Sequence, residues 1–279
     1  MTTELWLKQT ANELRSAGIG TARLDALVLL EDCLHTNRAQ LLAHPELTLS
    51  NTQIKVLNSW VKRRAMHEPL AYIRGKTEFY GREFIVSPAV LEPRPESETM
   101  IDLLKKNQAD LPSQPQLSIA DVGTGSGALG ITAKLELPNS RVELLEIDTD
   151  AIEIAKMNVI KHTTTISIIK SDLLGASSAD YTVLLCNLPY VPDTYAINQA
   201  AKAEPKLAIF GGKDGLDLYR RIFKQISILR NRPLLILTES LPPQHSALQT
   251  LAWQAGYTQT DEEDFIQAFT LSSLPTNKT

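Results

Sequence analysis

Short apolar segments alternate with helical segments over most of the chain beyond Pro95, and this order constrains the fold more than any other feature of the sequence. The expected strands lie at 118–122, 142–147, 166–170, 182–186 and 233–239, with helices at about 95–106, 129–135 and from Asp150 onward. Alternation of this kind is typical of a mostly parallel sheet with helices on both faces. We therefore predict an α/β fold of the doubly wound type.

The first 74 residues differ from this pattern because they read as helices only, and one of these helices opens on a capping box at residues 50–53. Two short β-rich runs follow on either side of a Gly81-Arg82 turn, which predicts a hairpin. We therefore expect a helical domain at 1–74, a β-hairpin connection at 75–92 and the sheet domain at 93–279.

The composition limits the kinds of function that are open to the chain. Its N-terminus lacks the apolar stretch of a signal peptide and its apolar runs are too short to cross a bilayer, so we expect a cytoplasmic protein without membrane contact. A net charge of −4 argues against stable nucleic-acid binding, which needs many phosphate-facing Lys and Arg side chains. Cys33 and Cys186 lie far apart in apolar segments, which favours reduced core thiols. The histidines show no ligand spacing, and we predict no metal site.

A glycine-rich loop follows the first predicted strand of the sheet and opens the next helix. Its glycines allow the backbone to turn sharply and to approach a ligand closely. The candidate ligand contacts in this loop are Asp121, Gly123, Thr124, Gly125, Ser126 and Gly127. With Gly130 the loop also satisfies the dinucleotide fingerprint, and Glu146 has the spacing of the acid that binds the ribose hydroxyls of either nucleotide. The loop and the acid alone therefore leave a nicotinamide dinucleotide and S-adenosylmethionine both open.

Three further features separate these two cofactors. Asp121 precedes the glycines and is suited to the methionine ammonium, and Ser171-Asp172 follows a later strand and is suited to the adenine edge. The third feature, after the next strand, is the tetrapeptide Asn187-Leu188-Pro189-Tyr190. A hydride-transfer enzyme has no use for this tetrapeptide, so the combination favours S-adenosylmethionine.

The tetrapeptide also indicates which atom reacts. The side-chain oxygen of Asn187 and the backbone carbonyl of Leu188 can each accept a hydrogen bond from a substrate NH2 group. Because an amide lone pair is delocalised into its carbonyl, holding both hydrogens turns that lone pair toward the sulfonium methyl and favours a pyramidal transition state. Tyr190, next to Pro189, offers a flat face for a planar group and cation–π attraction for the sulfonium. We predict methyl transfer to a planar amide or amine nitrogen, without an acid–base dyad or a metal.

With these residues in place, the whole chain resembles the peptide chain release factor glutamine methyltransferases. Apart from the glycine loop and the tetrapeptide, the matching segments are 67–73, 78–81, 90–98, 204–205 and 211–220. The resemblance implies a Rossmann-like class I methyltransferase sheet preceded by a helical substrate-recognition domain. It also implies an enzyme that methylates the glutamine in the Gly-Gly-Gln loop of a release factor, and we expect a monomer.

The same resemblance assigns the site residues. It implies that S-adenosylmethionine, and its product S-adenosylhomocysteine, binds at Gly123 to Gly127, at Glu146 and around Asp172-Leu173, and that it reaches Asn187. It implies that the substrate glutamine is held at Asn187 to Tyr190.

The main departure from the family pattern is Leu188, where the family usually carries a proline, and Glu146 replaces a more usual aspartate. Leu188 keeps the carbonyl that the substrate needs, and a ribose diol tolerates Glu146. Asn-Leu-Pro-Tyr also occurs in ribosomal RNA adenine dimethyltransferases, so an N6-adenine methyltransferase of RNA or DNA, acting on a flipped base, stays open as a second function. A noncatalytic S-adenosylmethionine-binding module and a nicotinamide oxidoreductase also stay open.

Overall fold

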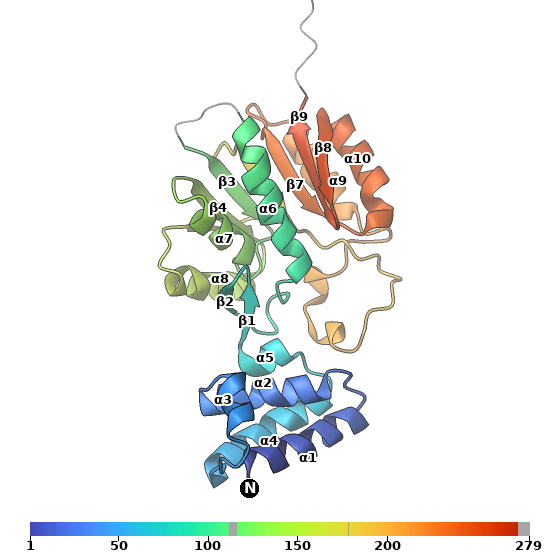
Figure 1. The fold of residues 1–279 in the computed structure, drawn as a ribbon. Coiled ribbons are helices and arrows are strands. Elements are labelled where there is room, and N and C mark those ends of the chain that lie inside the picture. The colour runs from blue at the N-terminus through green and yellow to red at the C-terminus, as the bar shows by residue number, and fades with distance from the viewer. Residues whose placement is uncertain (112–115, 178, 273–279) are drawn as a thin grey trace, which may run out of the picture. The chain divides into compact units, whose positions relative to one another are not determined.

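The computed structural model describes residues 1–111, 116–177 and 179–272 of the chain. The chain divides into two compact units, a smaller one of Met1–Lys76 with Ile197–Ala203 and a larger one of Thr77–Ala196 with Glu204–Thr279. Figure 1 shows both units and labels many of their elements. The domain boundaries expected from the sequence, after residues 74 and 92, stay predictions.

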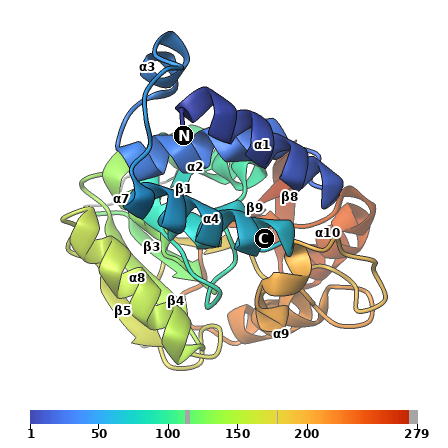
Figure 2. The same cartoon turned by 90° about the horizontal axis from the view of Figure 1, so that it is seen from below.

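The N-terminal part of the smaller unit is helical, as the sequence predicts. Its helices are α1 (Thr3–Ser16), α2 (Ala22–Leu34), α3 (Arg38–Ala43), α4 (Asn51–Ala65) and α5 (Leu70–Arg74). The predicted capping box is present at the start of α4. Gln53 N donates to Ser50 Oγ at a distance of 3.3 Å, and Ser50 N donates to Gln53 Oε1 at a distance of 2.9 Å. Helices α1, α2 and α4 pack side by side, as Figure 2 shows, around a core that includes Trp6, Leu30 and Leu57.

A hairpin follows, with β1 (Lys76–Phe79) and β2 (Arg82–Ile85) forming a two-stranded sheet. The hairpin confirms the sequence prediction, but the turn lies one residue earlier than expected. Its two central residues are Tyr80, with φ 52°, and Gly81, with φ 68°. Two successive positive φ angles match the right-handed twist of the flanking strands, which is why the turn centres there.

The larger unit contains a seven-stranded sheet in the order β5-β4-β3-β6-β7-β9-β8. The strands are β3 (Ser118–Val122), β4 (Arg141–Glu146), β5 (Ser167–Lys170), β6 (Val183–Cys186), β7 (Leu235–Glu239), β8 (Tyr257–Glu263) and β9 (Ile266–Leu271). Strands β3 to β7 are parallel, which confirms the predicted sheet, and each begins and ends within two residues of the expected bounds. The antiparallel pair β8–β9 was not predicted from the sequence.

Helices cover both faces of this sheet, as Figure 1 shows. They are α6 (Glu98–Asn107), α7 (Ala128–Glu136), α8 (Thr149–Lys161), α9 (Asp217–Ser227) and α10 (His245–Gln254), with short 3-10 turns η1 (Pro95–Ser97), η2 (Gln108–Asp110), η3 (Ala201–Ala203), η4 (Lys206–Ala208) and η5 (Pro242–Gln244). Helices α6, α7 and α8 share a core with one face of the sheet, and α9 and α10 share a core with the other. Successive strand residues alternate between the two cores, for example Leu144 and Leu145, because strand side chains have a period of two.

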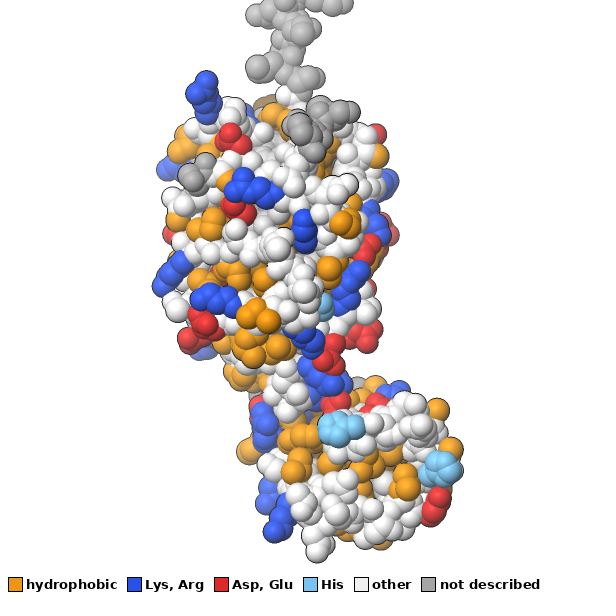
Figure 3. Space-filling view, turned by 90° about the vertical axis from the view of Figure 1, so that its left-hand side faces the viewer, with side chains coloured by type: hydrophobic (Ala, Val, Ile, Leu, Met, Phe, Trp, Pro, Cys, Tyr) orange, Lys and Arg blue, Asp and Glu red, His pale blue; other side chains and the backbone are white. Residues whose placement is uncertain are grey.

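On the face shown in Figure 3, Lys and Arg side chains lie among acidic and apolar ones and do not form one continuous basic area. No helix among residues 1–111, 116–177 and 179–272 is long and apolar enough to cross a bilayer.

Candidate active site

A cavity of about 200 Å³ lies in the larger unit, where strands β3, β4, β5 and β6 end. Doubly wound sheets bind ligands at this edge, because the loops that follow the parallel strands leave a crevice there. The predicted site residues that line it are Asp121, Gly123, Thr124, Gly125, Ser126, Glu146, Asp172, Leu173, Asn187, Leu188 and Pro189. Of the predicted residues, all of which the structure describes, Gly127 and Tyr190 lie outside the lining. Gly127 caps α7 and faces Ile131 and Leu144 of the core.

Asp121 is buried at the end of β3, and its Oδ2 accepts hydrogen bonds from Thr124 Oγ1 at 2.5 Å and from Gly130 N at 2.8 Å. Burial raises the pKa of Asp121 to about 6, although both hydrogen bonds oppose this shift. Since both bonds use Oδ2, Oδ1 keeps its lone pairs for a ligand cation as far as the described residues go. The absence of a side chain at Gly130 lets its backbone approach Asp121, because a Cβ there would lie 2.9 Å from Asp121 Cβ and 2.3 Å from Leu144 Cδ2.

Glu146 lies at the end of β4 with its carboxylate held by three main-chain donors. Its Oε2 accepts from Gly125 N at 2.9 Å, and its Oε1 accepts from Ile147 N at 2.8 Å and Asp148 N at 3.0 Å. These bonds orient the carboxylate and tie the glycine loop to β4. A carboxylate offers roughly four acceptor sites, so Glu146 keeps capacity for a ribose hydroxyl.

Asp172 follows β5 and pairs with Arg221 of α9, with 2.5 Å between Asp172 Oδ2 and an Arg221 guanidinium nitrogen. Both side chains are about half exposed, and both residues line the cavity. The neighbouring Leu173 is buried with φ 53°, and its carbonyl accepts from Ser171 Oγ at 2.7 Å. Arg221 was not predicted as a site residue, because it belongs to a helix and not to a loop that follows a strand.

Asn187 is oriented by two polar residues from distant parts of the chain. Its side-chain nitrogen donates to Ser97 Oγ at 2.9 Å, and Ser97 Oγ donates to Glu239 Oε2 at 2.6 Å. A hydroxyl has a single proton, and because Ser97 gives it to Glu239, its oxygen acts as the acceptor for Asn187. The amide nitrogen of Asn187 therefore faces Ser97, and its Oδ1 is left as an acceptor for a ligand in the cavity.

Tyr190 is tied to the same carboxylate, since its hydroxyl donates to Glu239 Oε1 at 2.9 Å. Burial and the neighbouring Glu239 raise the pKa of Tyr190, so its hydroxyl stays protonated and acts as a donor at neutral pH. Burial also raises the pKa of Glu239, while the hydrogen bonds from Ser97, Tyr190 and Asn187 lower it. Glu239 thus joins residues that are far apart in the chain, Ser97 and Tyr190.

Leu188, the second residue of the tetrapeptide, is buried. A Cβ added at Gly123 would lie 3.1 Å from Leu188 Cδ2, so the leucine side chain packs against the loop. Leu188 N donates to the Tyr219 hydroxyl at 3.4 Å, a hydrogen bond that a proline could not make. The Tyr219 hydroxyl lies 2.5 Å from the carbonyl oxygen of Glu239 and 2.9 Å from that of Cys186, and its single proton points toward these two acceptors.

The backbone beyond the tetrapeptide pairs with a second segment of the larger unit. Val191 N donates to the carbonyl oxygen of Ile209, and Gly211 N donates to that of Val191, with a donor–acceptor distance of 3.0 Å in each bond. The side chain of Gln244 also links the two segments, because its Nε2 donates to the carbonyl oxygens of Tyr190 at 2.8 Å and Asp214 at 2.7 Å.

Two glycines allow this close approach. A Cβ at Gly211 would lie 2.2 Å from the carbonyl oxygen of Pro189, and one at Gly215 would lie 2.0 Å from that of Tyr190. Both obstacles are backbone atoms, which cannot rotate aside. The glycines matched by resemblance therefore have a geometric role, since they let the segment pack directly on the tetrapeptide.

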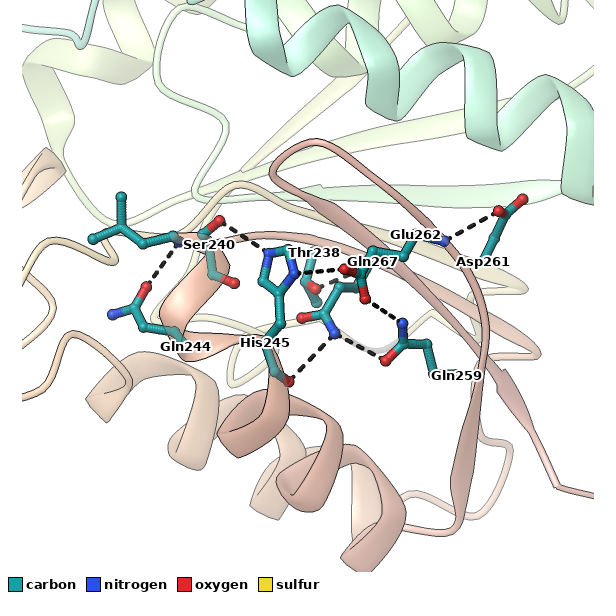
Figure 4. A network of polar contacts seen from close by, with 9 residues as sticks. Thr238, Ser240, Gln244, His245, Gln259, Asp261, Glu262 and Gln267 are labelled. Carbon is teal, nitrogen blue, oxygen red and sulfur yellow. Dashed lines mark hydrogen bonds and ion pairs between the residues drawn. The ribbon is translucent and has the colours of Figure 1, made fainter.

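Figure 4 shows a network of polar contacts next to the end of β7. His245, at the start of α10, contacts Glu262 of β8 with 3.0 Å between Nδ1 and Oε1. Gln267 of β9 donates to Gln259 Oε1 at 2.9 Å and to the His245 carbonyl at 3.3 Å. These bonds join the start of α10 to the β8–β9 hairpin, close in the sequence to Glu239 at the end of β7.

Comparisons with known proteins agree with this geometry. The family described as PrmC N-terminal domain matches residues 6–75, and the methyltransferase small domain matches residues 97–204. The release factor glutamine methyltransferase of Coxiella burnetii is 37% identical over 248 residues, which cover 88% of this chain and 88% of the relative. That of Koribacter versatilis is 34% identical and covers 81% of each chain.

Solved structures support the fold alone. A methyltransferase from Pyrococcus furiosus superposes with a TM-score of 0.52 at 15% identity, covering 81% of this chain and 100% of its own. The hMettl16 catalytic domain, solved in complex with a 3′UTR hairpin, gives a TM-score of 0.55 at 15% identity and covers 82% of this chain and 84% of its own.

The parallel sheet, the glycine loop that follows β3 and the tetrapeptide that follows β6 define an S-adenosylmethionine-dependent methyltransferase. Its sequence relatives place it more narrowly. The chain belongs to the release factor glutamine methyltransferase family, as the resemblance implied.

Proposed function

We propose that this enzyme transfers a methyl group from S-adenosylmethionine to the side-chain amide nitrogen of the glutamine in the Gly-Gly-Gln loop of peptide chain release factors. The observation that supports it most directly is the orientation of Asn187, whose nitrogen bonds Ser97 while its oxygen stays available at the cavity. The relatives in Coxiella burnetii and Koribacter versatilis carry the corresponding name. A monomeric, cytoplasmic enzyme is part of the same proposal.

The chemistry requires acceptors and not a base in the ground state. In our proposal Asn187 Oδ1 and the Leu188 carbonyl accept the two hydrogens of the glutamine NH2, which turns the nitrogen lone pair toward the methyl group. Tyr190 supports the substrate from outside the cavity lining, held there by Glu239. The displacement leaves S-adenosylhomocysteine and a protonated amide, which gives its extra proton to solvent.

The cofactor, when bound, supplies the electrophilic methyl group. We assign its methionine ammonium to Asp121, its ribose hydroxyls to Glu146 and its adenine edge to Asp172 and Leu173. The cofactor would lie against Gly123, Thr124, Gly125 and Ser126, which line the cavity, while Gly127 shapes the loop behind them. The cavity fits these roles, because it brings Asp121, Glu146 and Asp172 to one edge of the sheet with acceptor oxygens to spare.

Changing Asp121 to Asn should weaken cofactor binding by roughly 10- to 100-fold, because a charge-assisted hydrogen bond to the ammonium is lost. The wild-type affinity should also fall as the pH drops below about 6, since the raised pKa of Asp121 means that its carboxyl is neutral there. Isothermal titration with S-adenosylhomocysteine across that range tests both statements. The exposed Asp180→Asn is the matched control. A D121N affinity equal to that of the wild type would remove the ammonium assignment.

The N-terminal helices would recognise the protein substrate. The match of residues 6–75 to the PrmC N-terminal domain supports this assignment. A basic surface for nucleic acid would instead favour adenine methylation, but basic side chains are dispersed on the face in Figure 3 and the net charge is −4.

Transfer of labelled methyl from S-adenosylmethionine to a purified bacterial release factor tests the proposal. The comparison substrates are the same factor with Gly-Gly-Gln changed to Gly-Gly-Ala, and a structured RNA. Label on the wild-type factor alone would support glutamine methylation. Label on the RNA alone would support N6-adenine methylation, and tight cofactor binding without any transfer would support the noncatalytic module.

A further inference from the structure

Glu239 occupies an unusual position for a carboxylate. It ends β7, its side chain is buried, and its two oxygens accept from two different hydroxyls, Ser97 at 2.6 Å and Tyr190 at 2.9 Å. No Lys or Arg side chain among the described residues forms an ion pair with it. A buried carboxylate without a cationic partner is costly, so this arrangement needs a reason beyond stability.

The direction of the hydrogen bonds gives that reason. An ionised carboxylate accepts only, so both hydroxyls must point their protons at Glu239. The oxygen of Ser97 can then only accept from its other neighbour, and that neighbour is Asn187. The Asn187 amide is thereby forced to present its nitrogen to Ser97 and its oxygen to the cavity.

When Glu239 is protonated and neutral, the donor and acceptor roles of Ser97 and Asn187 can be reversed. A protonated Glu239 can donate to Ser97, which releases the Ser97 proton to point toward Asn187. Asn187 meets that proton by rotating its amide, which turns its NH2 into the cavity. An NH2 group cannot accept the hydrogens of a substrate amide, so this state cannot hold the substrate productively.

We propose that Ser97 and Glu239 are positioning residues that fix which end of the Asn187 amide faces the substrate. This inference rests on the proposed function, in which the substrate offers an NH2 group. Ser97 lines the cavity and Glu239 does not, and in this scheme both residues act through Asn187.

Several titratable groups face Glu239 from the elements packed around it. Glu96 of η1 and Tyr190 after β6 both act on its ionisation, and the Tyr219 hydroxyl of α9 bonds its carbonyl. His245 of α10 lies beyond, where it contacts the Ser240 carbonyl. Burial and the negative Glu96 both raise the pKa of Glu239, so the protonated state is reached at a higher pH than for an exposed glutamate.

The kinetic test uses Glu239→Gln and Ser97→Ala, with Thr238→Val as the matched control. Thr238 is the preceding residue of β7, and its hydroxyl contacts the carbonyl of Gln267 of β9, outside the bonds that reach Asn187. At saturating substrates, E239Q and S97A should lower kcat by roughly 10- to 100-fold with unchanged cofactor affinity, as expected for a misplaced contact. T238V should keep the wild-type kcat.

The pH profile separates positioning from a merely structural effect. Wild-type kcat should fall toward acid as Glu239 becomes protonated, and E239Q should lack this acidic limb because glutamine does not titrate. Protonation of Asp121 should instead lower the affinity for the cofactor, and it should not affect kcat when the cofactor is saturating. An E239Q enzyme with the wild-type kcat and the same acidic limb would overturn the proposal.

A measurement without substrate keeps this inference distinct from the proposed function. The side-chain NH2 signal of Asn187 in a ¹⁵N–¹H spectrum, assigned by its absence from N187D, should shift with acid titration in the wild type and stay constant in E239Q. If the wild-type enzyme leaves release factors unlabelled, the proposed substrate is wrong, while the titration still decides the role of Glu239. A signal that titrates equally in both proteins would contradict the positioning role.

Discussion

Replacing Asn187 with alanine is expected to lower kcat for methyl transfer by roughly 100- to 1000-fold, the loss seen when one preorganised transition-state contact is removed. The alanine removes the oxygen that would hold the substrate nitrogen, and it leaves Ser97 without its donor partner. Cofactor affinity should fall much less than kcat, because Asp121, Glu146 and Asp172 are untouched. Single-turnover transfer from labelled S-adenosylmethionine to a release factor, beside calorimetric titration with S-adenosylhomocysteine, measures both quantities.

Asn231→Ala is the control for this experiment. Asn231 is exposed, its amide donates to Asp180 Oδ2 at 2.7 Å, and it lies outside the cavity lining. It should keep full activity. Loss of cofactor binding in N187A, in parallel with its loss of turnover, would show that Asn187 supports the pocket as a whole and not the substrate nitrogen.

The sequence was sufficient to predict the parallel part of the fold. Strands such as β3 and β6 are apolar on both faces because helices cover both sides of the sheet, and this leaves an unmistakable apolar run. The hairpin β8–β9 was missed for the opposite reason. Strand β8 reads Tyr-Thr-Gln-Thr-Asp-Glu-Glu, and its residues after Tyr257 are partly or fully exposed at the edge of the sheet.

The cavity residues were predictable where they follow a strand. Asp121, Glu146 and Asn187 occupy strand ends, and the carboxyl ends of parallel strands meet at one edge whatever the details of packing. Gly127 and Tyr190 belong to the same motifs but are not among the residues that line the cavity, because a motif fixes the path of the backbone more closely than what each residue contacts.

The supporting residues could not be found from spacing. Ser97 and Glu239 are 142 residues apart, and Ser97 and Asn187 are 90 apart, so their contacts depend on how η1 packs against the sheet. A single acidic residue at the end of an apolar strand was the available signal. It indicates a buried carboxylate, but it does not indicate the partner.

Replacing Gly215 with alanine is expected to have the second large effect, a loss of kcat of roughly 100-fold in a protein that still folds. The new Cβ would lie 2.0 Å from the carbonyl oxygen of Tyr190, so one of the two backbone segments must move. The tetrapeptide is the segment that carries Asn187 and the Leu188 carbonyl. A displacement of about 1 Å there is enough to lose the geometry that methyl transfer requires.

Gly256→Ala separates this clash from simple backbone strain. Gly256 has φ 87° and Gly215 has φ 80°, so alanine strains both backbones similarly, by about 1–2 kcal/mol each. At Gly256, however, the added Cβ would meet only the tip of the Arg232 side chain at 3.2 Å, and that side chain can move aside. Thermal unfolding should therefore show both variants destabilised, while methyl transfer should fall in G215A alone. Equal activity losses in the two variants would mean that general destabilisation, and not the position of the tetrapeptide, limits the reaction.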